Sequence, residues 1–370
     1  MCGIFGGLSL SDKAVDKAVV ERMSEQVARR GPDDRGEFYD GPVVLGHRRL
    51  AIIDLSEKGH QPMTDVQQHL TIVFNGTIYN YPELRELLMS KGYRFQSHSD
   101  TEVILNAYAH WGEDCVEKLH GMFAFAIWDN RSQSLFLARD RMGIKPLYYL
   151  KTDQFFFFAS NPQALLKTGV CDTSIDPVSL HHLFTLHAVV PAPGTLFNGV
   201  KKCPPAHTMK FDKSGSLIFS RYWQLIAKRP KTPKSDAQWR EEIHQSLLQA
   251  VKKRLAIADV PVGVLLSGGL DSSLLVALLA EAGVPDIKTF SIGFEDQPEE
   301  KGNEFEYSDP VAEMYKTDHH KFLIPNAEVL QRLPEAVGSM AEPMFGQDAV
   351  AFYLLSERVS KSVKVVQSGQ

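Results

Sequence analysis

The sequence predicts a mixed α/β protein whose two parts differ in architecture. In the first 160 residues, β-rich segments are punctuated by helical stretches, which is typical of sheets covered by helices. From Trp239 onward, helices and strands alternate, and this order predicts a parallel α/β sheet. The polar, proline-containing segment 228–238 between them is typical of a linker. A chain of 370 residues is long enough for two domains, each with its own core.

Short strands and three helices are expected in the first part. Apolar Ile4 and Phe5 favour a strand at the N-terminus. Pro82 suits the first turn of a helix, and Ser99 or Asp100 would cap the helix that follows. The other expected strands are 43–45, 70–74, 122–128, 134–138, 147–150 and 155–159, the helices are 14–29, 82–91 and 101–111, and the proline-rich segment 187–207 should form turns.

The second part contains the most specific motif of the chain. An apolar strand at 262–266 runs into a glycine-rich turn, and a helix follows at 274–282. Glycines let the backbone approach oxyanions, and the first-turn amides of a helix attract them. The acid in the motif, Asp271, suits a phosphate site only if a divalent cation lies between its carboxylate and the phosphate. The motif is Ser267, Gly268, Gly269, Leu270, Asp271, Ser272 and Ser273, and further elements are expected as strands at 288–294 and 362–367 and a helix at 307–315.

A cysteine follows the initiator methionine, so removal of Met1 would leave Cys2 with a free α-amine. The reference pKa of an α-amine is about 7.7–8.0, so a fair fraction is neutral at cell pH. A neutral amine can take the thiol proton, directly or through a water, as in N-terminal nucleophiles. A cysteine in an N-terminal strand is the alternative interpretation.

Composition and charge exclude several classes of protein. The net charge of −5 argues against a surface for nucleic acid or anionic membranes. Four cysteines, at positions 2, 115, 171 and 203, have no metal-ligand spacing and indicate reduced thiols in the cytoplasm. No secretory signal pattern and no apolar run approaching 18 residues occurs, so neither export nor membrane spanning is expected.

Several separated motifs resemble the asparagine synthetase B family of glutamine-dependent amidotransferases, over essentially the whole chain. They are MCGIFG at 1–6, RGPD at 30–33, HRRL at 47–50, NGTIYN at 75–80, SDTEV at 99–103, RDRMGIKPLY at 139–148 and SGGLDSS at 267–273. The resemblance implies an N-terminal-nucleophile glutaminase with an αββα sandwich, followed by a PP-loop ATP-pyrophosphatase domain that forms an amide. It implies domains at 2–190 and 239–370, with a connecting segment at 191–238.

The resemblance also implies a glutamine site in the first part. Cys2 would be the nucleophile, and Asn75 and Gly76 the donors to the oxyanion. Arg49 would clamp the glutamine carboxylate and Asp100 would take its ammonium. The strand that holds glutamine through its backbone would be Leu50, Ala51, Ile52 and Ile53, and Thr77 stands where most members carry a glutamate that helps to bind the ammonium.

From the residues alone, these positions have other interpretations. Arg49 could be a surface arginine, and Asp100 a helix cap. An Asn75–Gly76 dipeptide after the strand at 70–74 favours a turn.

In the second part, the resemblance implies a site for ATP and Mg²⁺. Leu265 and Ile292 match positions that contact ATP, as do Ser368 and Gly369, although core residues and a turn are the alternatives. Asp271 would bind the Mg²⁺. A carboxylate would be activated as an acyl adenylate, and ammonia released at Cys2 would attack it. Gln370 stands where aspartate-amidating members carry a glutamate implicated in forming or using the adenylate.

The resemblance leaves the acceptor carboxylate open. Segments 74–85, 301–309, 317–320 and 365–370 look like the bacterial N-acetylglutaminylglutamine amidotransferase branch, while aspartate remains the main rival. We expect the chain to be a fragment, because it stops where a strand runs into an unfinished nucleotide loop. The expected partners are small molecules, with a homodimer as the assembly considered. A stand-alone glutaminase, a non-catalytic nucleotide-binding regulator and, less favoured, a nucleic-acid-modifying enzyme stay open.

Overall fold

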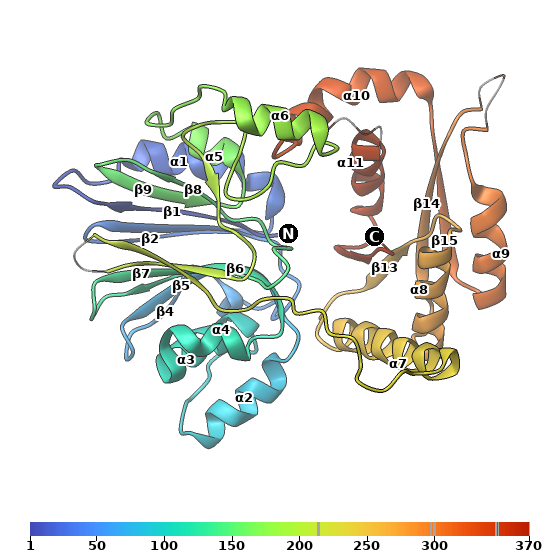
Figure 1. Ribbon diagram of the computed structural model, residues 1–370, viewed down its shortest axis with the longest axis horizontal. Helices are drawn as coiled ribbons and strands as arrows, with labels where there is room; N and C mark the ends of the chain where they lie inside the picture. Colours follow the sequence, from blue (N-terminus) through green and yellow to red (C-terminus); the bar gives the residue numbers. More distant parts are fainter. Residues whose placement is uncertain (213–214, 297, 299–300, 345, 347, 370) are drawn as a thin grey trace. The chain divides into compact units, whose positions relative to one another are not determined.

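The computed structural model describes residues 1–212, 215–296, 298, 301–344, 346 and 348–369. The chain forms two compact units, Met1–Ile226 and Ala227–Gln370 (Figure 1). Each cluster of buried apolar side chains among the described residues lies within a single unit, so each unit has its own core.

The first unit contains two six-stranded antiparallel sheets. One sheet has the order β10-β8-β9-β1-β3-β2, and the other has the order β12-β11-β7-β6-β5-β4. The strands of the first sheet are β1 (Gly3–Ser9), β2 (Asp34–Asp40), β3 (Val43–Arg49), β8 (Tyr148–Lys151), β9 (Phe155–Ala159) and β10 (Lys201–Lys202). Those of the second are β4 (Met63–Asp65), β5 (Leu70–Ile78), β6 (Gly121–Asp129), β7 (Ser134–Arg139), β11 (His207–Phe211) and β12 (Leu217–Arg221).

Helices cover the outer face of each sheet, which gives four layers in the order αββα (Figure 1). The inner faces pack on each other around Ile4, Leu45, Trp128 and Phe156. The first sheet is covered by α1 (Lys17–Gln26) and α5 (Pro162–Leu166), and the second by α2 (Tyr81–Ser90), α3 (Asp100–Trp111) and α4 (Cys115–Lys118), while α6 (Pro177–Thr185) packs in a small cluster with the loop after it. The expected αββα sandwich is confirmed.

The second unit contains a four-stranded parallel sheet in the order β15-β14-β13-β16. Helices α7 (Asp236–Leu255), α8 (Leu270–Glu281) and α9 (Phe305–Tyr315) pack on one face, and α10 (Asn326–Ser339) and α11 (Asp348–Val359) on the other. The strands are β13 (Val262–Leu265), β14 (Lys288–Phe294), β15 (Asp318–Ile324) and β16 (Val365–Gln367). The expected parallel sheet is confirmed, and it is wound in both directions from β13.

Three features of the fold differ from the expectations. The expected connecting segment contains strands β10, β11 and β12, of which β10 pairs with β8 and β11 with β7, so the first unit ends at Ile226 rather than at residue 190. Strands β2 and β15 were not expected, because the sequences of Asp34–Asp40 and Asp318–Ile324 are polar. Both strands lie at sheet edges, where polar residues are common. Helices α10 and α11 were also not expected.

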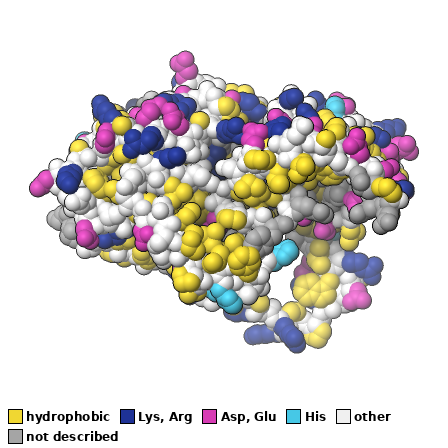
Figure 2. Space-filling model, turned by 90° about the horizontal axis from the view of Figure 1, so that it is seen from above, with side chains coloured by type: hydrophobic (Ala, Val, Ile, Leu, Met, Phe, Trp, Pro, Cys, Tyr) yellow, Lys and Arg dark blue, Asp and Glu magenta, His cyan; other side chains and the backbone are white. Residues whose placement is uncertain are grey.

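Charged and apolar side chains are mixed on the molecular surface. Figure 2 shows lysine, arginine and acidic side chains interspersed with hydrophobic ones on the face that it presents. Exposed apolar side chains include several on α6 and the loop after it, namely Val178, Leu180, Phe184, Leu186 and Val189. In the part of the chain that the structure describes, no helix is both long and apolar enough to cross a membrane.

Candidate active sites

The first site is built on one edge of β5. The Phe74 amide donates to Gln61 Oε1 at 2.7 Å, and the Ile78 amide donates to Asp100 Oδ2 at 3.0 Å. Amides two residues apart in a strand point to the same side. The Gly76 N–H therefore lies between these two amides, on the same edge.

The strand opposite Gly76 shows that this amide is not used within the sheet. Phe123 faces Gly76 across the β5–β6 ladder. The N–H of Phe123 donates to Asp140 Oδ2 at 3.1 Å, and its C=O accepts from the Asp140 amide at 2.8 Å. Gly76 and Phe123 are thus a non-hydrogen-bonded pair, and the Gly76 amide is directed away from β6. Only glycine fits here, because a Cβ would lie 2.2 Å from the Met122 carbonyl oxygen.

Asn75 supplies a second donor beside this amide. Its side chain is 1% exposed, and its Nδ2 has no hydrogen-bond partner among the described residues. Most buried polar groups are hydrogen-bonded, so an orphaned donor needs a reason, such as an absent ligand. The turn expected at Asn75–Gly76 from the residues alone is wrong, because β5 continues through both residues to Ile78 and pairs with β6.

Cys2 immediately precedes β1, and Asp100, which bonds to this edge, is near enough for its charge to add to burial in raising the pKa of the Cys2 thiol. His47 of β3 pairs with Ile4 of β1, and His47 Nε2 lies 3.1 Å from the Phe74 carbonyl oxygen of β5, which joins the two sheets at this level. Cys2 Sγ accepts a hydrogen bond from the Leu50 amide at 3.4 Å. Burial raises the pKa of the Cys2 thiol, while the Leu50 amide lowers it. A base nearby is therefore needed to form the thiolate.

Arg49 is buried rather than a surface arginine. Its Nη1 donates to the Ser56 carbonyl at 3.1 Å, and its Nη2 donates to the carbonyls of Ile53 and Asp54. A Cβ on Gly59 would lie 2.0 Å from Arg49 Nη2, so the loop closes tightly around the guanidinium. These bonds to backbone carbonyls use three of the five N–H donors of the guanidinium and hold the group in one place.

The segment 50–53 differs from its expected conformation. Strand β3 ends at Arg49, and residues 50–53 are irregular rather than a strand. The Ala51 amide donates to Asp33 Oδ2 at 2.8 Å, so a side chain takes the place of a sheet partner. The Leu50 amide and the Ile53 carbonyl likewise bond to side chains, those of Cys2 and Arg49, rather than to a neighbouring strand.

Asp100 lies at the N-terminus of α3 with its side chain buried. Ser99 Oγ, and not Asp100, caps the helix by accepting from the Thr101 amide at 3.1 Å. Burial raises the pKa of the Asp100 carboxyl to about 7, although hydrogen bonds from the Ile78 amide and its neighbours oppose the rise. A cationic ligand would favour the ionised form. Thr77, also buried, lies two residues after Asn75 and so shares its face of β5.

Gln61 positions this site but was not expected from the sequence. Its Oε1 accepts from the Phe74 amide, and its Nε2 donates to Thr101 Oγ1 at 3.1 Å. Gln61 thereby ties the edge of β5 to the first turn of α3, next to Asp100. No local pattern marks a glutamine in a loop for this task, so no sequence signal was available.

The second site is the loop between β13 and α8. Gly268 has φ +86°, and a Cβ there would lie 2.4 Å from the Tyr307 carbonyl carbon, so both conformation and space require glycine. Ser272 Oγ donates to the Gly269 carbonyl at 3.1 Å and accepts from the Ser267 amide at 3.3 Å, which closes the loop. Gly269 is the N-cap and has no side chain to cap the helix, which leaves first-turn amides for an anion.

The loop lies at the point where the sheet changes direction. Ligands of open α/β sheets bind beyond the carboxyl ends of the strands at such a switch point. Strands β13 and β16 are neighbours there, and a Cβ on Gly369 would lie 2.9 Å from Asp271 Cβ. The structure thus brings Ser368 and Gly369 next to the SGGLDSS loop. Gln370 lies outside the described residues.

A cavity of about 850 Å³ opens at this switch point, entirely within the second unit. Leu265 and Ile292 form part of its apolar lining, and Ser267, Gly269, Leu270, Asp271, Ser272, Ser368 and Gly369 line its polar end. Ser273 does not line the cavity; its amide donates to the Gly269 carbonyl at 3.0 Å and starts the helix.

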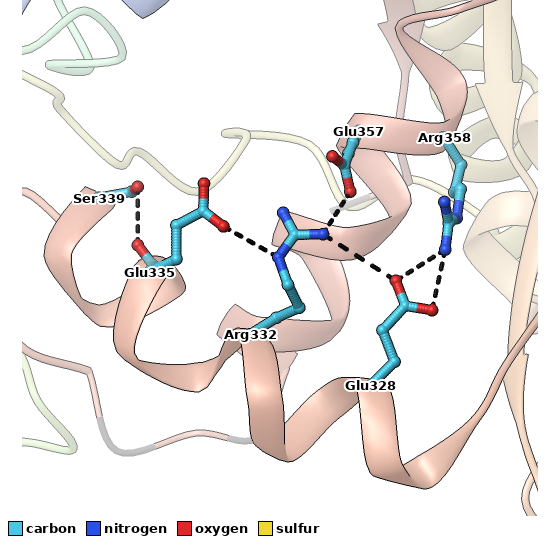
Figure 3. Close-up of polar contacts among 6 residues, drawn as sticks. All are labelled: Glu328, Arg332, Glu335, Ser339, Glu357 and Arg358. Atoms are coloured by element: carbon cyan, nitrogen blue, oxygen red, sulfur yellow. Dashed lines mark hydrogen bonds and ion pairs between the residues drawn. The ribbon is translucent and has the colours of Figure 1, made fainter.

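Helices α10 and α11 form another wall of this cavity, and an ion-pair network joins them (Figure 3). Arg332 of α10 contacts Glu335 and, at 2.9 Å, Glu357 of α11. Arg358 of α11 contacts Glu328 of α10 at 2.7 Å. An isolated exposed pair contributes only about 0–1 kcal/mol, but charges linked in a network hold one geometry better.

The residues at the second site fit a phosphate-bound Mg²⁺. Within the described ranges, no group of three or more histidine, cysteine or acidic side chains could hold a metal ion unaided. Asp271 presents one exposed carboxylate at the N-terminus of α8. Mg²⁺ is commonly bound through one or two carboxylates together with substrate phosphates. Asp271 alone therefore suffices only if a nucleotide supplies the other ligands.

Comparison with known families assigns both units. Residues 1–223 match the glutamine amidotransferase domain, and residues 242–370 match asparagine synthase. The first match ends at residue 223 and the second begins at residue 242. The boundary of the compact units, after Ile226, lies between them.

Three curated relatives show the family. Asparagine synthetase [glutamine-hydrolyzing] 3 of Bacillus subtilis is 37% identical over 91% of this chain and 56% of its own length. Asparagine synthetase [glutamine-hydrolyzing] 1 of the same organism is 36% identical over 100% of this chain and 57% of its own length. A putative asparagine synthetase [glutamine-hydrolyzing] 2 of Methanocaldococcus jannaschii is 35% identical over 100% of this chain and 74% of its own length. The chain spans little more than half the length of the two Bacillus relatives. It belongs to the family of glutamine-hydrolysing asparagine synthetases.

Proposed function

We propose that the first unit hydrolyses glutamine at Cys2 and that the second unit uses ATP to activate a carboxylate for amidation by the ammonia released. The observation that carries the proposal is the edge of β5. There the orphaned Nδ2 of buried Asn75 neighbours the outward-directed amide of Gly76. Asp100, bonded to the same edge, acts on the thiol of Cys2 through its charge.

In the first half-reaction, Cys2 Sγ attacks the side-chain amide carbon of glutamine while the α-amine takes the thiol proton. Asn75 Nδ2 and the Gly76 N–H donate to the oxyanion of the tetrahedral intermediate. Ammonia then leaves with that proton, and water hydrolyses the γ-glutamyl thioester to glutamate. Arg49 would bind the α-carboxylate of glutamine and Asp100 its α-ammonium, with Thr77 and the backbone of 50–53 around it.

In the second half-reaction, an oxygen of the acceptor carboxylate attacks the α-phosphorus of ATP, and pyrophosphate leaves. The SGGLDSS loop would bind the phosphates through its amides, with Leu265, Ile292, Ser368 and Gly369 around the nucleotide. When bound between Asp271 and the phosphates, Mg²⁺ would neutralise their charge. Ammonia then displaces AMP from the acyl adenylate to give the amide.

The acceptor, the assembly and the location complete the proposal. Aspartate is the acceptor supported by the names of the relatives, and an N-acetylated glutaminylglutamine dipeptide is the rival supported by the subfamily motifs. We propose a cytoplasmic enzyme that acts on small molecules and forms a homodimer.

The proposal is tested by replacing the nucleophile. Mature Cys2→Ala should lose glutamate release from glutamine by at least about 10³-fold, because no other group supplies the thiolate. Glutamate is measured by an enzyme-coupled assay, and Met1 removal is checked by intact mass. Cys171→Ala, a partly exposed cysteine of the same unit, is the matched control and should retain full activity. Equal activity of wild type and Cys2→Ala would contradict the proposal.

A further inference from the structure

His47 is a buried histidine that the glutaminase mechanism above does not use. It lies on β3 and reaches the other sheet, where its Nε2 is 3.1 Å from the Phe74 carbonyl oxygen of β5. A carbonyl oxygen only accepts hydrogen bonds, so Nε2 carries the proton and donates it. Burial lowers the pKa of His47 to about 3, although the bond to Phe74 opposes this change. The ring is therefore neutral near pH 7, and its other nitrogen, Nδ1, is an acceptor.

The second nitrogen of His47 lacks a partner. Nδ1 is buried and has no hydrogen-bond partner among the described residues. An unsatisfied buried polar atom is costly, and an apolar side chain of similar size would avoid that cost. The ring therefore adds an unsatisfied atom to the core for the sake of one hydrogen bond, which points to a task for the bond that Nε2 makes.

The carbonyl that His47 bonds lies beyond the end of the neighbouring strand. The last pair between β4 and β5 lies two residues before Phe74. The N–H and C=O of one residue in an antiparallel strand point to the same side, and those of Phe74 point away from β6. Side chains take the place of a strand here. Gln61 accepts from the Phe74 amide at 2.7 Å, and His47 donates to the Phe74 carbonyl, so the two complete the edge of β5 directly before Asn75.

His47 and Asn75 both face the space between the two sheets. Side chains two residues apart in a strand share a face. Leu45, two residues before His47, belongs to the apolar cluster of the inner faces. Val73, two residues before Asn75, belongs to the same cluster. The Phe74 carbonyl and the Asn75 N–H form one planar peptide group, so a bond to that carbonyl also fixes the backbone of the residue with the orphaned donor.

We propose that His47 is a positioning residue of the glutaminase site, whose bond from Nε2 to the Phe74 carbonyl holds Asn75 and Gly76 in the orientation that donates to the oxyanion. The inference rests on the proposed function and adds to it a residue that acts through the edge of β5 rather than on the substrate. The physical reason is that the donors must be aimed at the place where negative charge develops, and a misplacement of about 1 Å can cost about 10²-fold in rate.

The test is steady-state glutamine hydrolysis by mature protein, with kcat and KM determined separately. His47→Leu removes the donor, so kcat should fall by about 10–10²-fold while KM changes by less than about threefold, because the oxyanion donors act on the transition state. His47→Gln can place an amide N–H where Nε2 stood, and it should restore kcat to within about fivefold of the wild type. His181→Leu, at an exposed histidine of α6, is the control and should change neither quantity. Equal losses of kcat in His47→Leu and His47→Gln, or a loss confined to KM, would overturn the inference.

A double-mutant cycle with Asn75→Ala gives a second readout. Because His47 acts through Asn75, His47→Leu should cost kcat at least about threefold less in the Asn75→Ala background than in the wild type. Losses that simply multiply would overturn the inference. If His47→Leu does not fold, His47→Asn replaces it, since its shorter amide also removes the donor at Nε2. Wild-type protein that iodoacetamide alkylates at Cys2 but that does not hydrolyse glutamine would instead overturn the proposed function.

Discussion

At the residue scale, the most informative groups are buried polar atoms that the folded chain leaves without a partner. An unsatisfied buried donor costs about 1–3 kcal/mol, so a fold retains one only where something else depends on it. Asn75 Nδ2 is such a donor, and the glycine after it cannot carry a Cβ. The two adjacent residues thus supply two N–H donors, the number that an oxyanion hole commonly uses.

Asn75→Ala separates this function from stability. We expect kcat for glutamine hydrolysis to fall by about 10²–10³-fold with a smaller change in KM, because the donor acts mainly on the transition state. The thermal midpoint should stay close to that of the wild type, because the variant removes an unsatisfied polar group. Asn198→Ala, at an exposed asparagine of the same unit whose Nδ2 donates to Ser174 Oγ, should leave kcat unchanged. A large drop in the midpoint of Asn75→Ala with unchanged kcat would assign Asn75 to structure alone.

At the scale of elements, each site depends on how one secondary-structure element ends or continues. Strand β5 continues where a turn was expected, and it thereby aligns the amides of Phe74, Gly76 and Ile78 along one edge. Helix α8 begins directly after a glycine-rich turn, with an N-cap that has no side chain. Both arrangements leave backbone N–H groups for a ligand.

Replacing glycine by alanine should have opposite effects on stability in the turn before α8 and in α10. Gly268→Ala should abolish ATP-dependent pyrophosphate release and destabilise the second unit, since φ is +86° and the new Cβ would meet the Tyr307 backbone. Gly338→Ala, on an exposed turn of α10 with no atom within 4 Å of the new Cβ, should instead stabilise by about 0.5–1 kcal/mol. Pyrophosphate assays and thermal unfolding measure both effects. Normal pyrophosphate release by Gly268→Ala would contradict the assignment of this loop.

At the scale of the whole molecule, two units with separate cores carry the two proposed half-reactions. Buried apolar clusters of the first unit include no residue of the second, in the parts of the chain that are described. A change at one site should therefore leave the chemistry of the other unit largely intact.

Asp271→Asn tests this division of labour. It should lower ATP-dependent pyrophosphate release by at least about 10²-fold, because a neutral amide binds Mg²⁺ far less well than a carboxylate. Glutamate release from glutamine should remain within about twofold of the wild type, since sites in separate cores act independently. Asp286→Asn, at an exposed turn with φ +48° that asparagine also tolerates, is the control for both assays. Equal loss of both activities in Asp271→Asn would contradict two independent sites.

Local patterns predicted the two-part architecture, because hydrophobic periodicity, prolines and glycines act over a few residues. The parallel sheet, the strand before and the helix after the SGGLDSS loop, and the burial of the strands around Phe125 and Phe157 all follow from such patterns. They could not predict strands β2 and β15, whose polar residues form strands only because a neighbouring strand offers hydrogen bonds.

Cys2 and the phosphate-binding loop could be recognised from the chain alone, since each derives its chemistry from consecutive residues. Pairing across the sheets was needed to show that Asn75 lies in a strand with an orphaned side-chain amide and that Gln61 joins β5 to α3. It was also needed to show that Arg30 donates to the Cys2 carbonyl. Gln61 is 13 and 40 positions from Phe74 and Thr101, and Arg30 is 28 positions from Cys2, and no local signal reports a contact of that range. Only the packed fold brings such groups into one water-poor space, where burial and neighbouring charge set their chemistry.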